Sequence, residues 1–308
     1  MNTFNSTFFS NTILSLGVLL RMAGFFLIMQ ASGEILLLEL VHIPGDFATH
    51  PEKLALIPHI QLILVLVQGV GMLLGFVVLP LLYLNYFRSY ETPSRLLRAV
   101  PRQIWYMTAS VILLMVSIPM IEQLSLLNKN MSLPDALHSI EDMMNKTEKS
   151  AAALTAILVQ YNGPFHFLLV FIVVAIIPAV GEELVFRGIV QNELQHIWNN
   201  KHLAIWVSGF IFSFIHFQFF GFLPRMLLGV LFGYCYLWTG SLWVPIAMHF
   251  TNNALTLVVS AFYKNSFLNT SESENTLFDI RFFIAYIVAQ AVFLFVYYKL
   301  IRQQPVTT

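Results

Sequence analysis

Long apolar runs are the feature that most constrains this chain. Stretches rich in Leu, Ile, Val and Phe recur along most of its 308 residues. A helix needs roughly 20 apolar residues to cross a bilayer, so each run predicts a transmembrane helix. Helices are expected because a backbone inside the bilayer must satisfy its own hydrogen bonds. The fold class is therefore all-α, a polytopic bundle of about eight spans. The predicted spans are approximately residues 12–40, 59–85, 103–125, 163–190, 203–220, 223–239, 242–262 and 281–300.

The overall composition agrees with a membrane protein and excludes other classes. Hydrophobic residues make up 57% of the chain and charged residues only 10%, whereas soluble domains carry about 25% charged residues. The formal net charge is zero, so no basic excess points to nucleic acid. One cysteine excludes an intrachain disulfide. We expect a multi-pass integral membrane protein, surrounded by the lipid bilayer and without a nucleic-acid partner.

Two connections between the spans are informative. Positive loops tend to face the cytoplasm, and the loop 86–102 is rich in arginine. With eight spans, this places both termini in the cytoplasm, and the short loops suggest a bacterial inner membrane. In the longest loop, 128–162, apolar residues recur at helical spacing among acidic residues, which predicts an amphipathic helix at the surface. The arginines of the first loop are Arg88, Arg95, Arg98 and Arg102.

Ionisable side chains inside the apolar spans are the second informative feature. Such side chains are costly in a bilayer and mark a functional site by default. The predicted spans 163–190, 203–220 and 242–262 each carry one polar cluster. The candidate site residues are Glu182, Glu183, Arg187, His216, His249 and Asn253.

Helix geometry predicts how these side chains are directed. Glu183 and Arg187 are four residues apart, so they share a helix face and can pair. Glu182 is rotated by about 100° from its neighbour and is free to point into a cavity. On the other span, His249 and Asn253 are also four residues apart and share a face.

The spacing around Asn199 predicts which spans meet. Glu182 and His216 lie equally far from Asn199 along the sequence. A turn at that point would place them at the same depth in an antiparallel hairpin, which is compatible with contact. Pro178 and Gly181 come just before Glu182 and are expected to kink the helix and loosen backbone groups around the site.

Each of these residues also has a purely structural interpretation. Glu183 and Arg187 can form a plain ion pair, and a lone histidine in a membrane helix is more often a packing residue than a catalyst. Asn253 can join two helices through a hydrogen bond. These interpretations weaken because all six residues lie in one short part of the chain, on spans that can converge.

The three polar motifs resemble those of the CPBP family of intramembrane proteases, named for CAAX proteases and bacteriocin-processing enzymes. The resemblance covers about residues 163–260. It implies a CPBP-like catalytic core over residues 161–262. Before the core, residues 1–160 form N-terminal transmembrane helices with the amphipathic segment, and after it residues 263–308 form a loop and a C-terminal helix. The motifs read Glu182-Glu183-x-x-x-Arg187, Phe212-x-x-x-His216 and His249-x-x-x-Asn253.

The resemblance implies hydrolysis of a peptide bond by one of two schemes. In the preferred scheme no cofactor is required: Glu182, helped by His216, activates water, while His249 and Asn253 stabilise the oxyanion. Arg187 then orients Glu183. In the alternative scheme Glu182, His216 and His249 bind zinc, and Glu183 is the base. The short zinc-protease helix motif with two histidines four residues apart is absent, which favours the metal-free scheme.

The expected partner is a protein or peptide substrate at the membrane, and the residues indicate neither its identity nor an oligomeric state. Two other functions fit some of the same residues. Intramembrane Glu and His also occur in proton-coupled transporters, although no inverted repeat is evident. An inert immunity or scaffold protein is the third possibility, which the intact motifs oppose.

Overall fold

The computed structural model describes residues 59–87, 93–262 and 280–302, together with residues 17, 20, 24, 53 and 57. These residues form an all-α bundle without strands, as predicted. The predicted span 12–40 and most of the polar loop 262–279 lie outside the described residues. The elements, in order, are α2 (Ile60–Met72), η2 (Leu73–Val78), α3 (Leu79–Phe87), α4 (Pro93–Leu96), α5 (Gln103–Lys129), η3 (Asp135–Leu137), α6 (His138–Leu158), α7 (Pro164–Phe171), η4 (Ile172–Ile176), α8 (Ile177–Glu183), η5 (Leu184–Val190), α9 (Gln191–Trp198), α10 (Lys201–Phe214), η6 (Phe219–Gly221), α11 (Phe222–Thr239), α12 (Trp243–Phe262) and α14 (Ile280–Arg302).

Several of these elements join into long helices that can cross a membrane. Within the described part of the chain, five helices are long and apolar enough to do so, and the protein is an integral membrane protein. Helix α10 has 14 residues, which span only about 21 Å of a core roughly 30 Å thick. The five helices are Ile60–Tyr86, Gln103–Lys129, Pro164–Trp198, Phe219–Thr239 and Ile280–Ile301.

Two of the predicted spans had wrong boundaries. The span predicted to end near residue 190 continues to Trp198, because the polar residues after 190 extend the helix instead of forming a loop. The span predicted over 203–220 ends at Phe214, and the chain reverses before η6 begins. The turn expected near Asn199 is confirmed. Asn199 has a left-handed φ of 50°, and the side chain of Asn200 caps α10 by accepting from the N–H groups of His202 and Leu203.

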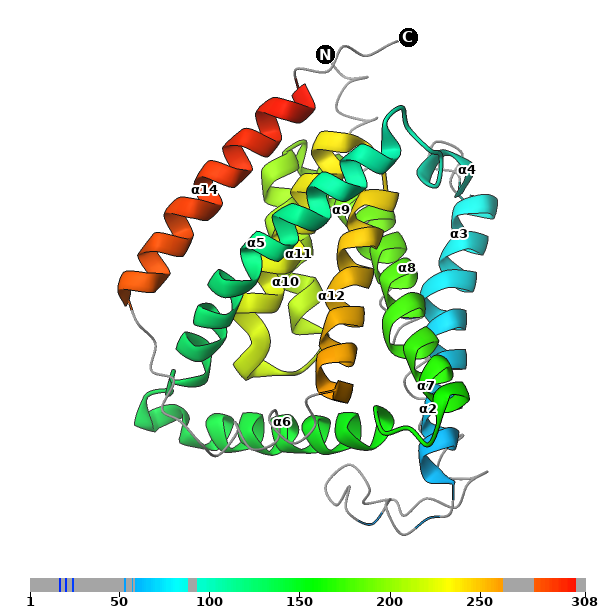
Figure 1. Cartoon of the computed structure of the whole chain (residues 1–308), viewed down its shortest axis with the longest axis vertical. Helices are drawn as coiled ribbons and strands as arrows, with labels where there is room; N and C mark the ends of the chain where they lie inside the picture. Colours follow the sequence, from blue (N-terminus) through cyan, green and yellow to red (C-terminus); the bar gives the residue numbers. More distant parts are fainter. Residues whose placement is uncertain are drawn as a thin grey trace.

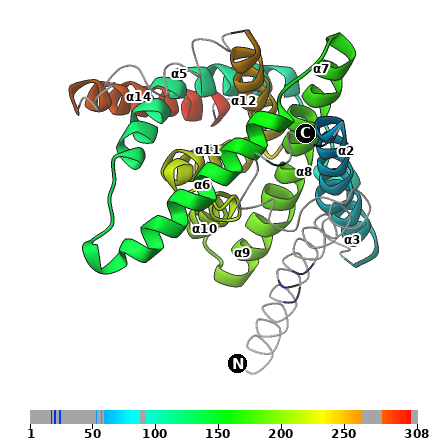
Figure 2. The ribbon, with the colours of Figure 1, turned by 90° about the horizontal axis from the view of Figure 1, so that it is seen from below.

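The predicted amphipathic helix is present as α6, and none of its residues is buried. Figure 1 shows α6 lying across one end of the bundle, at a steep angle to α8 and α12. Seen from below, α6 crosses beneath α10 and α11 (Figure 2). Helix α4 and the last turn of α14 lie at the opposite end (Figure 1). An amphipathic helix in this position is suited to the membrane surface.

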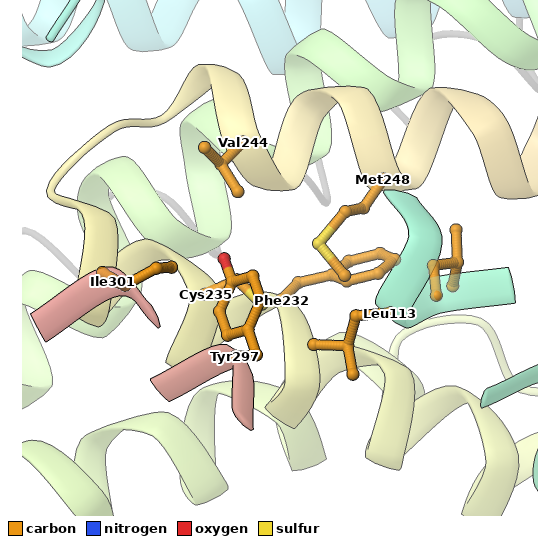
Figure 3. Close-up of a cluster of buried hydrophobic side chains, with 8 residues drawn as sticks. Leu113, Phe232, Cys235, Val244, Met248, Tyr297 and Ile301 are labelled. Atoms are coloured by element: carbon orange, nitrogen blue, oxygen red, sulfur yellow. The ribbon is translucent and has the colours of Figure 1, made fainter. Parts of the chain in front are cut away.

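Packing between the helices uses apolar side chains and glycines. One buried cluster joins α5, α11, α12 and α14 (Figure 3), and the Tyr297 and Ser110 hydroxyls form a buried hydrogen bond between α14 and α5. Helices α10 and α11 approach so closely that a Cβ atom on Gly229 would lie 3.1 Å from the Cα atom of Gly209. Small residues at such crossings are typical of membrane helix pairs. The cluster includes Leu113, Phe232, Cys235, Val244, Met248, Tyr297 and Ile301.

Candidate functional site

The long helix from α7 to α9 carries the first polar motif. Helix α8 ends with Glu182 and Glu183, and the π-helical segment η5 follows and contains Arg187. A second π-helical segment, η4, comes before α8. Pro178 has no N–H group to offer to the carbonyl of Val174 four residues earlier, and π-helical segments accompany such irregularities and occur frequently at functional sites. The helix therefore continues through Pro178 with altered hydrogen bonding on both sides of the carboxylates.

Glu183 and Arg187 form the pair expected from their spacing. Arg187 Nη1 donates to Glu183 Oε1 over 2.8 Å, and the two side chains are 1% and 0% exposed. The second terminal nitrogen, Arg187 Nη2, donates to the Gly229 carbonyl on α11 over 2.7 Å. The guanidinium also lies over the rings of Phe212 and Phe232, at 5.2 and 5.5 Å from their centroids, where cation–π attraction adds to its binding. The pair thus fixes η5 against α10 and α11.

His249 on α12 completes the buried group by a contact that the sequence spacing did not predict. Its Nδ1 lies 2.7 Å from Glu183 Oε1, the oxygen that also accepts from Arg187. An ionised carboxylate can only accept, so Nδ1 carries the hydrogen in this arrangement. Glu183 therefore receives two hydrogen bonds and holds the imidazole ring in one orientation.

The other ring nitrogen of His249 faces the second carboxylate. His249 Nε2 lies 3.8 Å from Glu182 Oε2, which is too long for a direct hydrogen bond. The separation suits a bridging molecule, because a water oxygen can lie about 2.8 Å from both atoms. Glu182 is 8% exposed and His249 5% exposed, so the gap lies in a largely dry environment.

His216 lies near this group but in a turn, and its predicted place inside a helix was wrong. Helix α10 ends at Phe214, and Phe217 has a left-handed φ of 52° that reverses the chain. His216 is half-buried, and its Nδ1 donates to the Phe212 carbonyl over 2.8 Å, which leaves Nε2 as an acceptor. The Glu182 carboxylate interacts electrostatically with His216, but no hydrogen bond joins the two side chains directly.

Asn128 at the end of α5 holds this turn, and sequence reasoning missed it. Its side-chain amide donates to the Phe219 carbonyl over 2.8 Å, and its carbonyl oxygen accepts from the Leu223 N–H over 2.9 Å. Asn128 is 7% exposed, and both bonds are partly buried. The only signal in the sequence was a polar asparagine at the end of an apolar span. Asn128 therefore ties the chain that carries His216 to α5.

Asn253 lies one helical turn after His249 on α12 and faces the irregular part of the neighbouring helix. Its Nδ2 donates to the Val174 carbonyl over 3.4 Å, the carbonyl to which Pro178 has no N–H to offer. In this arrangement Asn253 joins α12 to η4, as its structural interpretation predicted. The spacing of four residues also keeps Asn253 on the face of α12 that carries His249.

The zinc alternative names Glu182, His216 and His249 as its three ligands. Among the described residues, no group of three His, Cys, Asp or Glu side chains is gathered closely enough to hold a metal ion. His249 binds Glu183 through Nδ1 and His216 binds the Phe212 carbonyl through Nδ1, so each ring keeps Nε2, as metal-binding histidines do. The zinc scheme therefore stays a prediction.

The fold and the site together define a class of protein: a multi-pass α-helical membrane protein with a buried Glu–Glu–Arg–His cluster between its core helices. Residues 164–255 match the family model described as type II CAAX prenyl endopeptidase Rce1-like. This match confirms the resemblance seen in the motifs to CPBP/CAAX proteases, over residues 164–255.

Two curated bacterial proteins match parts of the chain. The membrane-embedded CAAX protease MroQ of Staphylococcus aureus is 30% identical over 113 residues, which are 35% of this chain and 45% of that protein. The uncharacterized protein YpbD of Bacillus subtilis is 32% identical over 81 residues, 25% of this chain and 38% of that protein. The chain thus spans less than half the length of these relatives. No solved structure matches.

Proposed function

We propose that this protein is an intramembrane endopeptidase that hydrolyses a peptide bond of a membrane-associated or lipid-modified protein or peptide. The observation that carries the proposal is the 3.8 Å gap between Glu182 Oε2 and His249 Nε2. This gap lies inside a buried cluster, and Glu183 fixes one of its walls by binding the His249 ring. The family of residues 164–255 agrees with the reaction class.

In the proposed reaction Glu182 is the general base. Its carboxylate takes a proton from the water in the gap, and the resulting hydroxide forms a bond to the carbonyl carbon of the substrate. The carbonyl oxygen becomes an oxyanion, to which Asn253 and the doubly protonated ring of His249, which then donates from Nε2, are assigned as the stabilising side chains. Glu182 then returns the proton to the amide nitrogen, the C–N bond breaks, and a new carboxyl terminus and a new amine leave.

The remaining polar residues are assigned supporting roles. Glu183 positions the ring of His249, and Arg187 neutralises Glu183 while binding the Gly229 carbonyl. His216 assists Glu182 from the turn that Asn128 holds. We place the protein in a bacterial inner membrane with both termini cytoplasmic, because the arginine-rich loop 86–102 is the strongest positive segment between spans. The last turn of α14 and α4 lie at the same end of the bundle, which agrees with this orientation (Figure 1).

Metal removal separates the two schemes. The metal-free scheme predicts that purified protein contains far less than one zinc per chain and that cleavage is unchanged after treatment with a chelator. Elemental analysis of the active fraction and a cleavage assay before and after dialysis against chelator measure both quantities. One zinc per chain, with activity lost on chelation and restored by zinc, would reject the scheme.

A comparison of peptide termini tests the proposed function and reveals the substrate at the same time. Cells carrying the wild-type chain are expected to contain new N- and C-termini in at least one membrane-associated protein. These termini should be missing in cells that carry Glu182→Gln at equal abundance. Quantitative mass spectrometry of N- and C-terminal peptides makes the measurement. Identical termini in the two strains, with both proteins present in membranes, would contradict the proposal.

A further inference from the structure

A second cavity, with a few polar side chains in a largely apolar lining, lies at the end of the bundle, away from the Glu182–His249 gap. Its volume is about 300 Å³, and it lies between the first turns of α2 and α7. Ile60 of α2 packs against Leu154 and Ile157 of α6, so the cavity is at the level of the amphipathic helix. That level corresponds to the lipid headgroups. The lining residues are His59, Gln61, Leu62, Asn162, Phe165, His166 and Leu169.

The buried polar atoms of this cavity are hydrogen-bond donors without partners among the described residues. His166 Nδ1 accepts from the Asn162 N–H over 3.3 Å, so a neutral ring carries its hydrogen on Nε2. His166 Nε2 and Gln61 Nε2 are both buried, and no described residue pairs with either atom. Buried donors left unpaired are unfavourable, and such groups call for a ligand that accepts hydrogen bonds.

The charge around the cavity points to the same ligand chemistry. The lining contains neither Asp nor Glu within the described part of the chain, so no carboxylate of this wall competes for the donors. Helices α2 and α7 both begin here, and neither has a side-chain cap from a described residue. The Ile60 N–H donates to the Ile57 carbonyl, and α7 begins with Pro164, which has no N–H, so the later N–H groups of each first turn are the ones that face an anion. The cavity therefore combines two side-chain donors with the positive ends of two helices.

The apolar part of the lining identifies the kind of molecule that carries the acceptor. Phe165 is 81% exposed and Leu62 41% exposed, on membrane helices whose outer faces meet lipid. A molecule with phosphate oxygens in the cavity and a hydrocarbon chain along these side chains matches both the buried hydrogen-bond donors and the exposed apolar side chains. From this arrangement we infer that the cavity binds the phosphate group of a membrane phospholipid, with an acyl chain lying against Leu62 and Phe165.

Lipid binding to the purified, delipidated full-length chain tests this inference. Native mass spectrometry with dioleoyl phosphatidylglycerol is expected to show a bound lipid, whereas dioleoylglycerol, which has the same chains and no phosphate, is expected to bind far more weakly. Gln61→Leu combined with His166→Leu should weaken phosphatidylglycerol binding by about tenfold or more, since two hydrogen bonds to a charged group are lost. Thr108→Val, on the lipid-facing groove between α5 and α14, is the matched control and should bind like the wild type.

A second variant keeps the inference testable if the double variant does not fold. Gln61→Glu preserves the shape of the side chain and places a negative charge opposite the phosphate, so it should also lose the lipid. Inorganic phosphate is added in a separate arm. Competition by phosphate at millimolar concentration would locate the recognition in the phosphate group, and a requirement for the whole lipid would show that the chain contributes as well. Equal binding of phosphatidylglycerol and dioleoylglycerol, or unchanged binding by both variants, would overturn the inference.

Discussion

Glu182→Gln is expected to reduce peptide cleavage by about 10²–10⁴-fold, the range over which general bases contribute. The amide has nearly the shape of the carboxylate but cannot take a proton from water. Among the described residues, Glu182 has no direct hydrogen-bond partner. Its nearest ionisable neighbour is His249, whose Nε2 lies 3.8 Å from Glu182 Oε2. The substitution should therefore leave the fold and the melting temperature close to those of the wild type, so the lost activity can be assigned to chemistry.

A matched carboxylate elsewhere in the membrane region controls for the general loss of charge. Glu122 lies on α5, and its side chain is exposed. Glu122→Gln should retain wild-type cleavage of the same substrate at the same protein concentration. Initial rates for the three proteins in detergent or lipid nanodiscs make the comparison. Cleavage by Glu182→Gln within threefold of wild type would remove Glu182 from the role of base.

Arg187→Met is expected to be the most destabilising single substitution in the site. The side chain is 1% exposed and pairs with Glu183, which is fully buried. Removing one partner of a buried pair leaves an uncompensated charge and costs about 3–5 kcal/mol. The bond from Nη2 to the Gly229 carbonyl is also lost. Thermal unfolding followed by circular dichroism or intrinsic fluorescence should show a clear fall in melting temperature.

A double substitution separates the charge effect from the chemistry. Combining Arg187→Met with Glu183→Gln removes the orphaned charge, so much of the lost stability should return. Cleavage should stay low, because His249 loses the carboxylate that holds its Nδ1. Arg225→Met is the matched control, since Arg225 on α11 bonds only to Gln218 oxygens in the described structure. An Arg187→Met protein as stable as the wild type would contradict the buried-pair account.

The sequence predicted the features that depend on neighbours along one helix. The contact of Glu183 with Arg187 follows from a four-residue spacing, and it forms even though η5 is π-helical. The hairpin at Asn199 followed from polar residues between two apolar runs. The all-α architecture and the surface position of α6 followed from hydrophobic patterning. Each of these depends on local periodicity, which the sequence shows directly.

The features that the sequence did not predict depend on how separate helices are rotated against each other. Glu183 and His249 are 66 residues apart, and their contact requires α8 and α12 to present those faces to one another. The turn at His216 depends on the left-handed backbone of Phe217, a conformation that Phe rarely adopts. Asn128 holds that turn from 91 residues away. None of these contacts produces a periodic pattern in the sequence.

The contacts among the site residues therefore differ from those that the sequence suggested. The sequence grouped Glu183 with Arg187 as a support pair and left His249 with Asn253. The structure makes Glu183 the common acceptor of Arg187 and His249. Glu182 then stands opposite His249 Nε2, as the carboxylate without a direct hydrogen bond to any described residue. A carboxylate without a direct hydrogen bond, beside a fixed imidazole, suits the proposed role of Glu182 as the base that activates water.

The most direct test of this account is cleavage in water enriched in ¹⁸O, once a substrate has been identified from its termini. Purified wild-type protein, freed of metal, should produce a new carboxyl terminus that carries one ¹⁸O atom from the solvent, as mass spectrometry of the product peptide would show. Glu182→Gln at the same concentration should produce no such peptide over the same time. Equal amounts of labelled product from both proteins would contradict the assignment of Glu182 as the residue that activates water.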